Sequence, residues 1–208
     1  MAEAGTVIEQ GLVAALELAA DTPWTEITLA AIAAKAGLAL SDFHGAGGRE
    51  AIVEALDGYF DKAMSAEGVP EETLARERLF EVIMKRFEAM EDHRAGVREL
   101  MKFRETSLAH VVRLPVHRHA SAAWALASAG LDDDSGAPAS LKRIAVAFVI
   151  AETERAWRKD HHGDFALTMA ALDKGLRRAE ERLGQFRKWT GRKGGGSDND
   201  KRENEETA

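Results

Sequence analysis

The 208-residue sequence contains no cysteine, only four prolines and a single tyrosine, and aromatic residues make up 6% of it. Without thiols, the chain has no disulfide framework, no thiol nucleophile and no cysteine-ligated zinc site. Hydrophobic residues make up 45% of the sequence, which is enough to bury a core. Long stretches rich in Ala, Leu, Glu and Arg favour helices and leave few β-branched or aromatic residues for strands. The composition therefore predicts an all-α protein.

A membrane-spanning run and a targeting sequence are also lacking. No apolar stretch reaches spanning length, and the first residues carry an acid but no basic or Arg-rich leader. We therefore expect a cytoplasmic protein.

The net charge of −7 is unevenly distributed along the chain. Residues 1–62 contain ten acids and three bases, whereas residues 173–193 contain eight bases and three acids. Residues 194–208 have no apolar side chain larger than alanine and cannot offset the entropy of ordering. We expect four regions: a helix-turn-helix unit over 1–62, a linker over 63–71, a ligand-binding and dimerisation domain over 72–189, and a disordered tail over 190–208.

Prolines, glycines and apolar periodicity divide the chain into helices. Thr28 offers an N-cap for a short helix that Gly37 ends, and Pro115 opens or kinks a later helix. The expected helices span residues 6–20, 29–36, 40–44, 49–64, 72–91, 94–105, 115–129, 139–160 and 164–189.

Residues 12–20 and 24–38 resemble the N-terminal helix-turn-helix of the tetracycline-repressor (TetR) family. In that family the next helix reads the DNA major groove and is usually rich in Tyr, His and basic residues. Residues 41–50 here read Ser-Asp-Phe-His-Gly-Ala-Gly-Gly-Arg-Glu, which is one residue short, lacks the aromatic pair and places two glycines at the helix end. We therefore expect a degenerate unit, and the acidic charge of residues 1–62 opposes DNA binding. In the alternative of a DNA-binding repressor, the residues at or beside the DNA are Lys35, Ser41, Asp42, His44 and Arg49.

A second set of residues lies between positions 124 and 176. It comprises Trp124, Gly130, Asp132, Lys142, Arg143, Ala145, Trp157, Asp160, Asp164, Phe165, Thr168, Leu172, Asp173 and Leu176. This set resembles the C-terminal domain of the coenzyme Q (ubiquinone) biosynthesis accessory family, which is built on a TetR-like fold that has lost its DNA-binding role. The resemblance implies a homodimeric, non-catalytic protein that binds an isoprenoid or ubiquinone-precursor-like lipid and presents it to a ring-modifying hydroxylase. Ala139 and Ser140 replace that family's Trp-Tyr pair, which is implicated in contact with the hydroxylase.

The last two expected helices each carry a long apolar face. Such a pair buries itself readily against its own twofold copy, so we expect a homodimer. The interface residues expected are Ala145, Phe148, Val149, Thr153, Ala156, Met169, Leu172 and Leu176. Asp160 and Asp164 lie beside Gly163, and we expect them to end one helix and cap the next.

A wide apolar stripe over residues 79–90 faces a second apolar group farther along the chain. The two groups can enclose a ligand pocket or can form an ordinary core, in which the methionines fill gaps. The candidate ligand-binding residues are Leu79, Phe80, Ile83, Met84, Phe87, Leu100, Met101, Phe103 and Trp124.

Apolar and basic residues alternate at the end of the last expected helix. This composition is typical of a helix at a membrane interface, where Phe186, Lys188 and Trp189 would contact lipid at the inner membrane. The alternative is a solvated helix end whose bases complement the helix dipole.

Histidine pairs at 117 and 119 and at 161 and 162 do not face the same way on a helix, so neither chelates a metal by itself. The acids at 132–134 lack the spacing of a calcium loop, and no Ser, His and acid grouping indicates a nucleophile. We therefore expect no catalysis, no metal and no cofactor. The leading hypothesis is a lipid-binding accessory protein, and the alternative is a ligand-responsive TetR-type transcriptional repressor.

Overall fold

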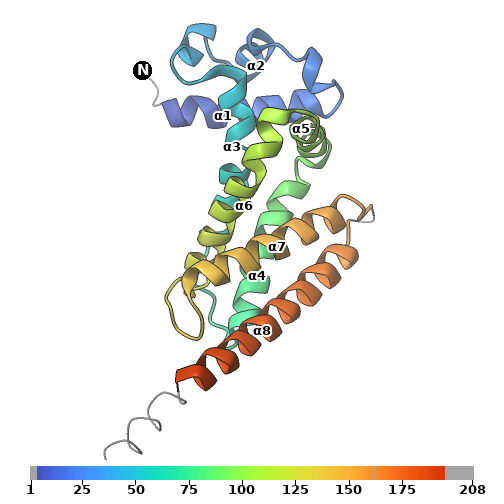
Figure 1. Cartoon of the computed structure of the whole chain (residues 1–208). Coiled ribbons are helices and arrows are strands. Elements are labelled where there is room, and N and C mark those ends of the chain that lie inside the picture. Colours follow the sequence, from blue (N-terminus) through green and yellow to red (C-terminus); the bar gives the residue numbers. More distant parts are fainter. Residues whose placement is uncertain (1–3, 162, 195–208) are drawn as a thin grey trace, which may run out of the picture.

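The computed structural model describes residues 4–161 and 163–194, with side chains up to residue 188. These residues form eight α-helices and three short 3₁₀ helices without a strand, which confirms the all-α prediction. The α-helices are α1 (Ala4–Ala19), α2 (Leu29–Ala36), α3 (Gly48–Asp61), α4 (Ala75–Glu91), α5 (Arg94–Thr106), α6 (Leu108–Ser128), α7 (Ala139–Trp157) and α8 (Ala166–Gly194) (Figure 1). The 3₁₀ helices are η1 (Trp24–Glu26), η2 (Leu40–Phe43) and η3 (Lys62–Ser65). Residues 195–208, most of the expected tail, lie outside the described residues.

The helices α1 to α3 form a small unit at one end of the molecule (Figure 1). The Thr28 hydroxyl accepts a hydrogen bond from the Ala31 N–H at 3.1 Å and caps α2. Gly37 ends α2 with a φ of 68°, a left-handed conformation that glycine adopts without strain. Both ends of α2 are therefore where the sequence predicts them.

The element that follows α2 is the single 3₁₀ turn η2. The Phe43 side chain is buried against α1, where a Cβ atom at Gly11 would lie 2.8 Å from the phenyl ring. Gly47 and Gly48, with φ values of 101° and 61°, turn the chain into α3. The TetR family has a DNA-reading helix at this position. This chain has only the four residues of η2, which the Phe43 side chain anchors to α1.

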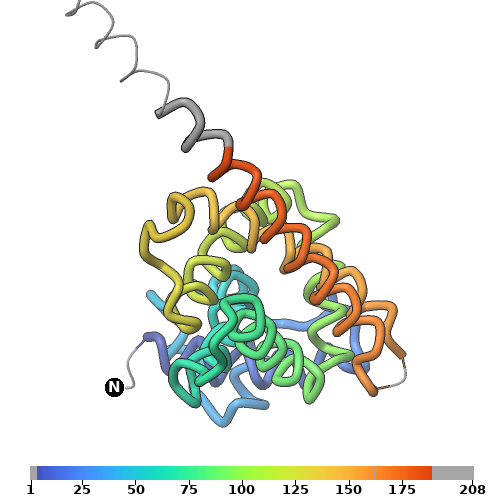
Figure 2. The backbone as a smooth tube through the Cα atoms, turned by 90° about the horizontal axis from the view of Figure 1, so that it is seen from below, coloured from blue at the N-terminus to red at the C-terminus, as the bar shows by residue number. Residues whose placement is uncertain are grey.

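The helices α4 to α8 form the larger part of the molecule. α8 packs mainly against α7 and also contacts α4, so it lies along the outside of the bundle (Figure 2). The largest difference from the sequence expectation is α6, which begins at Leu108 and passes through Pro115. Pro115 has no N–H to donate to the Val111 carbonyl, one helical turn earlier. Because Val111 is exposed, water can replace this missing hydrogen bond.

A buried cluster of charged side chains joins the N-terminal unit to the larger part. Nη2 of Arg86 on α4 donates to Asp57 Oδ1 at 2.8 Å and to Glu154 Oε1 at 3.4 Å, and its Nη1 donates to Asp61. Arg104 on α5 donates to the second oxygen of Asp57 at 2.6 Å. These five residues, which we call the junction cluster, connect α3 with α4, α5 and α7.

No helix among the described residues is both long enough and apolar enough to cross a bilayer.

Candidate functional site

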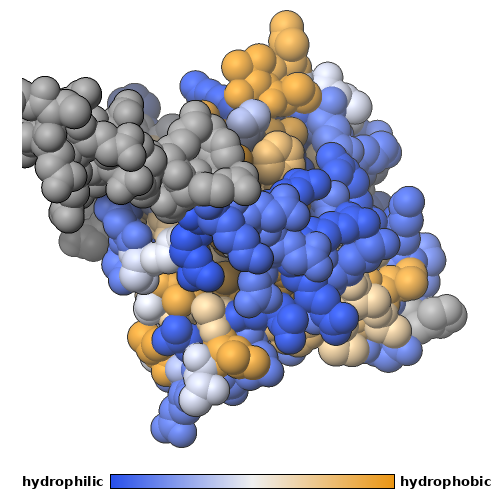
Figure 3. All heavy atoms as spheres, turned by 60° about the horizontal axis from the view of Figure 1, so that its bottom comes forward, coloured by the Kyte–Doolittle hydropathy of each residue, from blue (hydrophilic) through white to orange (hydrophobic). Residues whose placement is uncertain are grey.

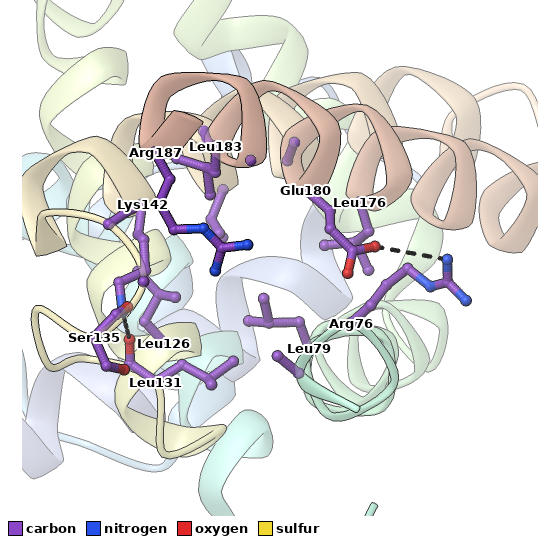
Figure 4. A pocket seen from close by; sticks show the side chains of 17 residues that line it. Arg76, Leu79, Leu126, Leu131, Ser135, Lys142, Leu176, Glu180, Leu183 and Arg187 are labelled. Carbon is purple, nitrogen blue, oxygen red and sulfur yellow. Dashed lines mark hydrogen bonds and ion pairs between the residues drawn. The ribbon is translucent and has the colours of Figure 1, made fainter. Parts of the chain in front are cut away.

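A cavity of about 390 Å³ lies between the start of α4, α7, α8 and the loop that connects α6 to α7 (Figure 4). This volume falls within the range of small-molecule sites. The residues that line the cavity are Ala75, Arg76, Leu79, Leu126, Leu131, Ser135, Gly136, Ala137, Lys142, Ala145, Val146, Leu176, Ala179, Glu180, Leu183, Gly184 and Arg187.

The inner wall of the cavity is apolar. Leu126, Val146 and Leu176 are buried in the hydrophobic core, and Leu131 is half-buried against it. The half-buried Leu183 extends this wall along α8. Because these side chains come from α6, α7, α8 and the loop, the cavity exists only once the larger part of the chain has folded.

The outer wall is the loop between α6 and α7, and Lys142 holds it in place. The Lys142 ammonium donates to the Leu131 carbonyl at 2.9 Å, to Asp133 Oδ1 at 3.1 Å and to the Ser135 carbonyl at 3.2 Å. Hydrogen bonds from Ser135 and Lys142 lower the pKa of Asp133. The acidic loop that the sequence indicates is therefore an ordered wall of the cavity.

Four charged side chains lie at the rim of the cavity. Arg76 and Glu180 form an ion pair at 3.8 Å between α4 and α8. The guanidinium of Arg187 points into the cavity from α8, whereas that of Arg76 points away from it (Figure 4). With Lys142, the rim carries three cations and one anion.

Only Leu79 of the nine residues expected to line a pocket belongs to this cavity. Phe80 lies in an open groove between α4 and α8, and Trp124 is 47% exposed on α6. Phe103 packs against the rings of Trp24 and His110. The other five are core residues: Ile83, Met84, Phe87, Leu100 and Met101. The stripe on α4 thus fills the core, because η3, α8, α3, α6 and α5 all pack against this helix.

The wall of the cavity that α8 contributes was not predicted from the sequence. Leu176, which the sequence predicts in the dimer interface, and Leu183, for which no role was predicted, both line the cavity. Phe186 is half-buried and Lys188 is exposed, while the Trp189 side chain lies outside the described residues. The visible surface at this end is mostly hydrophilic, with separate hydrophobic patches (Figure 3).

The surface expected to face DNA has its two cations engaged in internal contacts. Lys35 forms an ion pair with Glu17 at 2.9 Å. The Arg49 guanidinium lies 4.7 Å from the centre of the Trp24 ring and donates to the Trp24 carbonyl at 2.6 Å.

The remaining residues expected beside DNA offer no cation. Asp42 accepts a hydrogen bond from the Ala39 N–H at 3.0 Å and so stabilises η2. Ser41 and His44 are exposed. The unit therefore presents few groups that could meet phosphates.

The expected dimer residues divide into an exposed and a buried set. Phe148 is 67% exposed and Met169 is also exposed, whereas Ala145 and Ala156 are half-buried. The residues buried within one protomer are Val149, Thr153, Leu172 and Leu176. α7 and α8 pack closely at Gly175, where a Cβ atom would lie 3.1 Å from Val149. The buried set therefore holds α7 and α8 together within one chain.

Several of the residues that resemble the coenzyme Q accessory family stabilise the connection between α7 and α8. Arg94 lies 4.7 Å from the centre of the Trp157 ring and donates to the Trp157 carbonyl at 2.6 Å, which caps α7. Asp160 accepts hydrogen bonds from the Thr168 N–H at 3.0 Å and hydroxyl at 2.9 Å; burial acts to raise its pKa, but these hydrogen bonds lower it. Asp164 accepts from the Ala166 N–H at 3.1 Å. Both aspartates therefore cap the start of α8, whereas α7 ends at Trp157, three residues before Asp160.

Within the part of the chain that the structure describes, no group of three or more His, Asp or Glu side chains is arranged to hold a metal ion.

No protein-family model and no curated protein matches the sequence. Among solved structures, the chain is similar to a TetR transcriptional regulator from Rhodococcus sp. RHA1, with a TM-score of 0.59 and 16% sequence identity. The match covers 86% of this chain and 97% of that chain. At this identity the likeness shows the fold, and the chain has a TetR-like, all-helical fold.

Proposed function

We propose that the chain is a non-catalytic binding protein that takes an apolar small molecule into the cavity between α4, α7 and α8. The observation that carries the proposal is the cavity itself, about 390 Å³ with an apolar inner wall built from four segments. The isoprenoid or ubiquinone-precursor-like lipid implied by the sequence resemblance belongs to this ligand class. Delivery of that lipid to a hydroxylase is the corresponding role in ubiquinone biosynthesis.

Native mass spectrometry of the purified protein tests this proposal, followed by titration with the neutral isoprenoid geranylgeraniol. We expect a bound apolar molecule, and Leu183→Trp should abolish binding because the indole ring fills the cavity beside Gly184. Leu167→Trp is the matched control, because Leu167 lies on the same helix, is exposed and does not line the cavity. Equal ligand binding by a folded Leu183→Trp variant would contradict the assignment of the cavity.

A homodimer formed through the outer faces of α7 and α8 is part of the proposal. The exposed Ile144 and Phe148 on α7 support it, because a contiguous apolar surface on a helix pair favours association with a second copy.

A DNA-binding repressor is the second candidate function. It is favoured by the fold and by the solved neighbour, which is described as a transcriptional regulator. A repressor must bind duplex DNA with an affinity that rises steeply as the salt concentration falls. Anisotropy of a labelled duplex decides between the two candidates: salt-dependent binding that Arg49→Gln weakens supports the repressor, and no binding at low salt excludes it for that sequence.

A further inference from the structure

We infer that the ligand is a chain longer than the cavity, and that its far end continues past Arg76 and Glu180 into the groove between α4 and α8. The groove is then a second part of the same binding site. The inference rests on the proposed function and adds the class of ligand, a long flexible chain of which cavity and groove each hold one part.

The first observation is the size of the cavity. If a methylene group takes roughly the 30 Å³ that one water occupies in the liquid, the cavity of about 390 Å³ holds on the order of a dozen carbons. Geraniol is short enough to fit, whereas geranylgeraniol, which is twice as long, is not. A long chain therefore needs a further apolar surface beside the cavity.

The second observation is that the groove offers such a surface. Its volume is about 590 Å³, and Phe80, Met169 and Ala170 form its apolar part. Met169 is 39% exposed, so a chain that lies along it removes apolar surface from water. Asp173, which also lines the groove, pairs with Arg177 at 2.8 Å, so the chain would not cover an isolated charge there.

The third observation is that the two hollows are neighbours. On α4, Leu79 lines the cavity and Phe80 lines the groove, while Arg76, one helical turn before both, lines the two hollows together. On α8, the groove is lined from within residues 169–177 and the cavity from within residues 176–187, so one hollow follows the other along the helix. Cavity and groove therefore form one path along the crossing of α4 and α8 (Figure 1), which only the Arg76 side chain interrupts.

The side chain between the two hollows is held weakly. Arg76 pairs with Glu180 at 3.8 Å, and the two side chains are 31% and 66% exposed. An exposed ion pair at this distance contributes little to stability, so opening it costs little. The guanidinium of Arg76 already points away from the cavity, and the pair lies at one side of it (Figure 4). A chain can therefore pass from the cavity to the groove while the core stays intact.

Binding of geraniol and geranylgeraniol to the full chain tests the inference, measured by isothermal titration calorimetry below their aggregation concentrations. Met169→Asp places a charge in the groove. It should weaken binding of geranylgeraniol about ten-fold or more, because several of its carbons lose an apolar contact and each buried methylene adds to the affinity. Binding of geraniol, which the cavity holds alone, should stay the same. Ala170→Trp, which fills the groove without adding charge, should have the same selective effect.

Leu167→Trp is the matched control, since Leu167 is exposed on the same helix and lines neither hollow. It should leave binding of both alcohols unchanged. Equal losses for the two alcohols in Met169→Asp, or no loss for either, would overturn the inference while the proposed function stands. If the unmodified protein binds neither alcohol, the proposed function fails and the inference fails with it.

Discussion

Arg86 is almost completely buried, and its guanidinium holds together parts of the chain that are far apart in sequence. It contacts Asp57 and Asp61 on α3 as well as Glu154 on α7. Arg118 adds a cation at 3.0 Å from Glu154. Burying a charge is costly unless partners compensate it, so each member of the junction cluster depends on the others.

Asp57→Asn should destabilise the protein by about 3–5 kcal/mol, because Arg86 and Arg104 would both lose a buried carboxylate partner. Urea denaturation followed by circular dichroism measures this change in the free energy of unfolding. Asp173→Asn is the control, since this aspartate pairs with Arg177 one helical turn away near the surface; its loss should cost about 0.5 kcal/mol or less. Similar stabilities for the two variants would show that the junction cluster is not a stabilising element.

The same variant should change how stability depends on pH. Burial acts to raise the pKa of Asp57, but Arg104 and Arg86 hold it below its usual range. A lowered pKa in the folded state contributes stability above pH about 4 that is lost as the pH falls below this value. Burial raises the pKa of Asp61, whose contribution therefore has the opposite sign. Asp57→Asn should flatten the loss of stability below pH 4, as measured by denaturation at several pH values.

At the scale of elements, α1 and α5 approach each other more closely than side chains allow. A Cβ atom at Gly96 would lie 2.0 Å from the Leu16 carbonyl oxygen, so only glycine fits at this crossing. The Trp24 N–H also donates to Glu99 on α5 at 3.0 Å. The N-terminal unit therefore packs directly against α5.

Gly96→Ala should destabilise the protein by about 1–3 kcal/mol, because the methyl group forces α1 away from α5. Gly58→Ala is a matched control in α3, where a Cβ atom would have no neighbour within 4 Å. The control should be stabilised by up to about 1 kcal/mol, since alanine favours helix formation over glycine. Thermal unfolding of both variants measures the difference, and a stabilised Gly96→Ala variant would contradict the close crossing.

The sequence predicts elements whose signals are local. Thr28 and Gly37 bound α2 through contacts within a few residues, and apolar periodicity locates the long helices. The sequence leaves open whether Pro115 opens or kinks its helix, and the start of α6 at Leu108 was not predicted, because the cost of an internal proline depends on the exposure of its neighbours. The cavity was not predicted either, since its walls come from segments about a hundred residues apart. From sequence alone, Leu183 is equally consistent with a membrane contact and a cavity wall.

At the scale of the whole molecule, the homodimer that we propose would form through the outer face of α7 and α8. Phe148 is 67% exposed beside a hollow of about 90 Å³, whose lining includes Ala145, Val149 and Gly175. In a twofold dimer, the same surface on each copy meets its equivalent, so the ring of one copy can occupy the hollow of the other. Glu152 and Arg178 also line the hollow and form an ion pair with each other at 3.8 Å within the chain.

Phe148→Asp should convert the proposed dimer to a monomer, because two carboxylates would replace two aromatic rings at the centre of the proposed interface. Size-exclusion chromatography with light scattering measures the mass, 22.6 kDa for one chain. Leu108→Asp is the control, since Leu108 is the more exposed side chain, at 79%, but lies on α6 away from this face. The control should remain dimeric. A dimer that survives Phe148→Asp and dissociates with Leu108→Asp would move the interface to α6, because an aspartate disrupts only the apolar contact into which it is introduced.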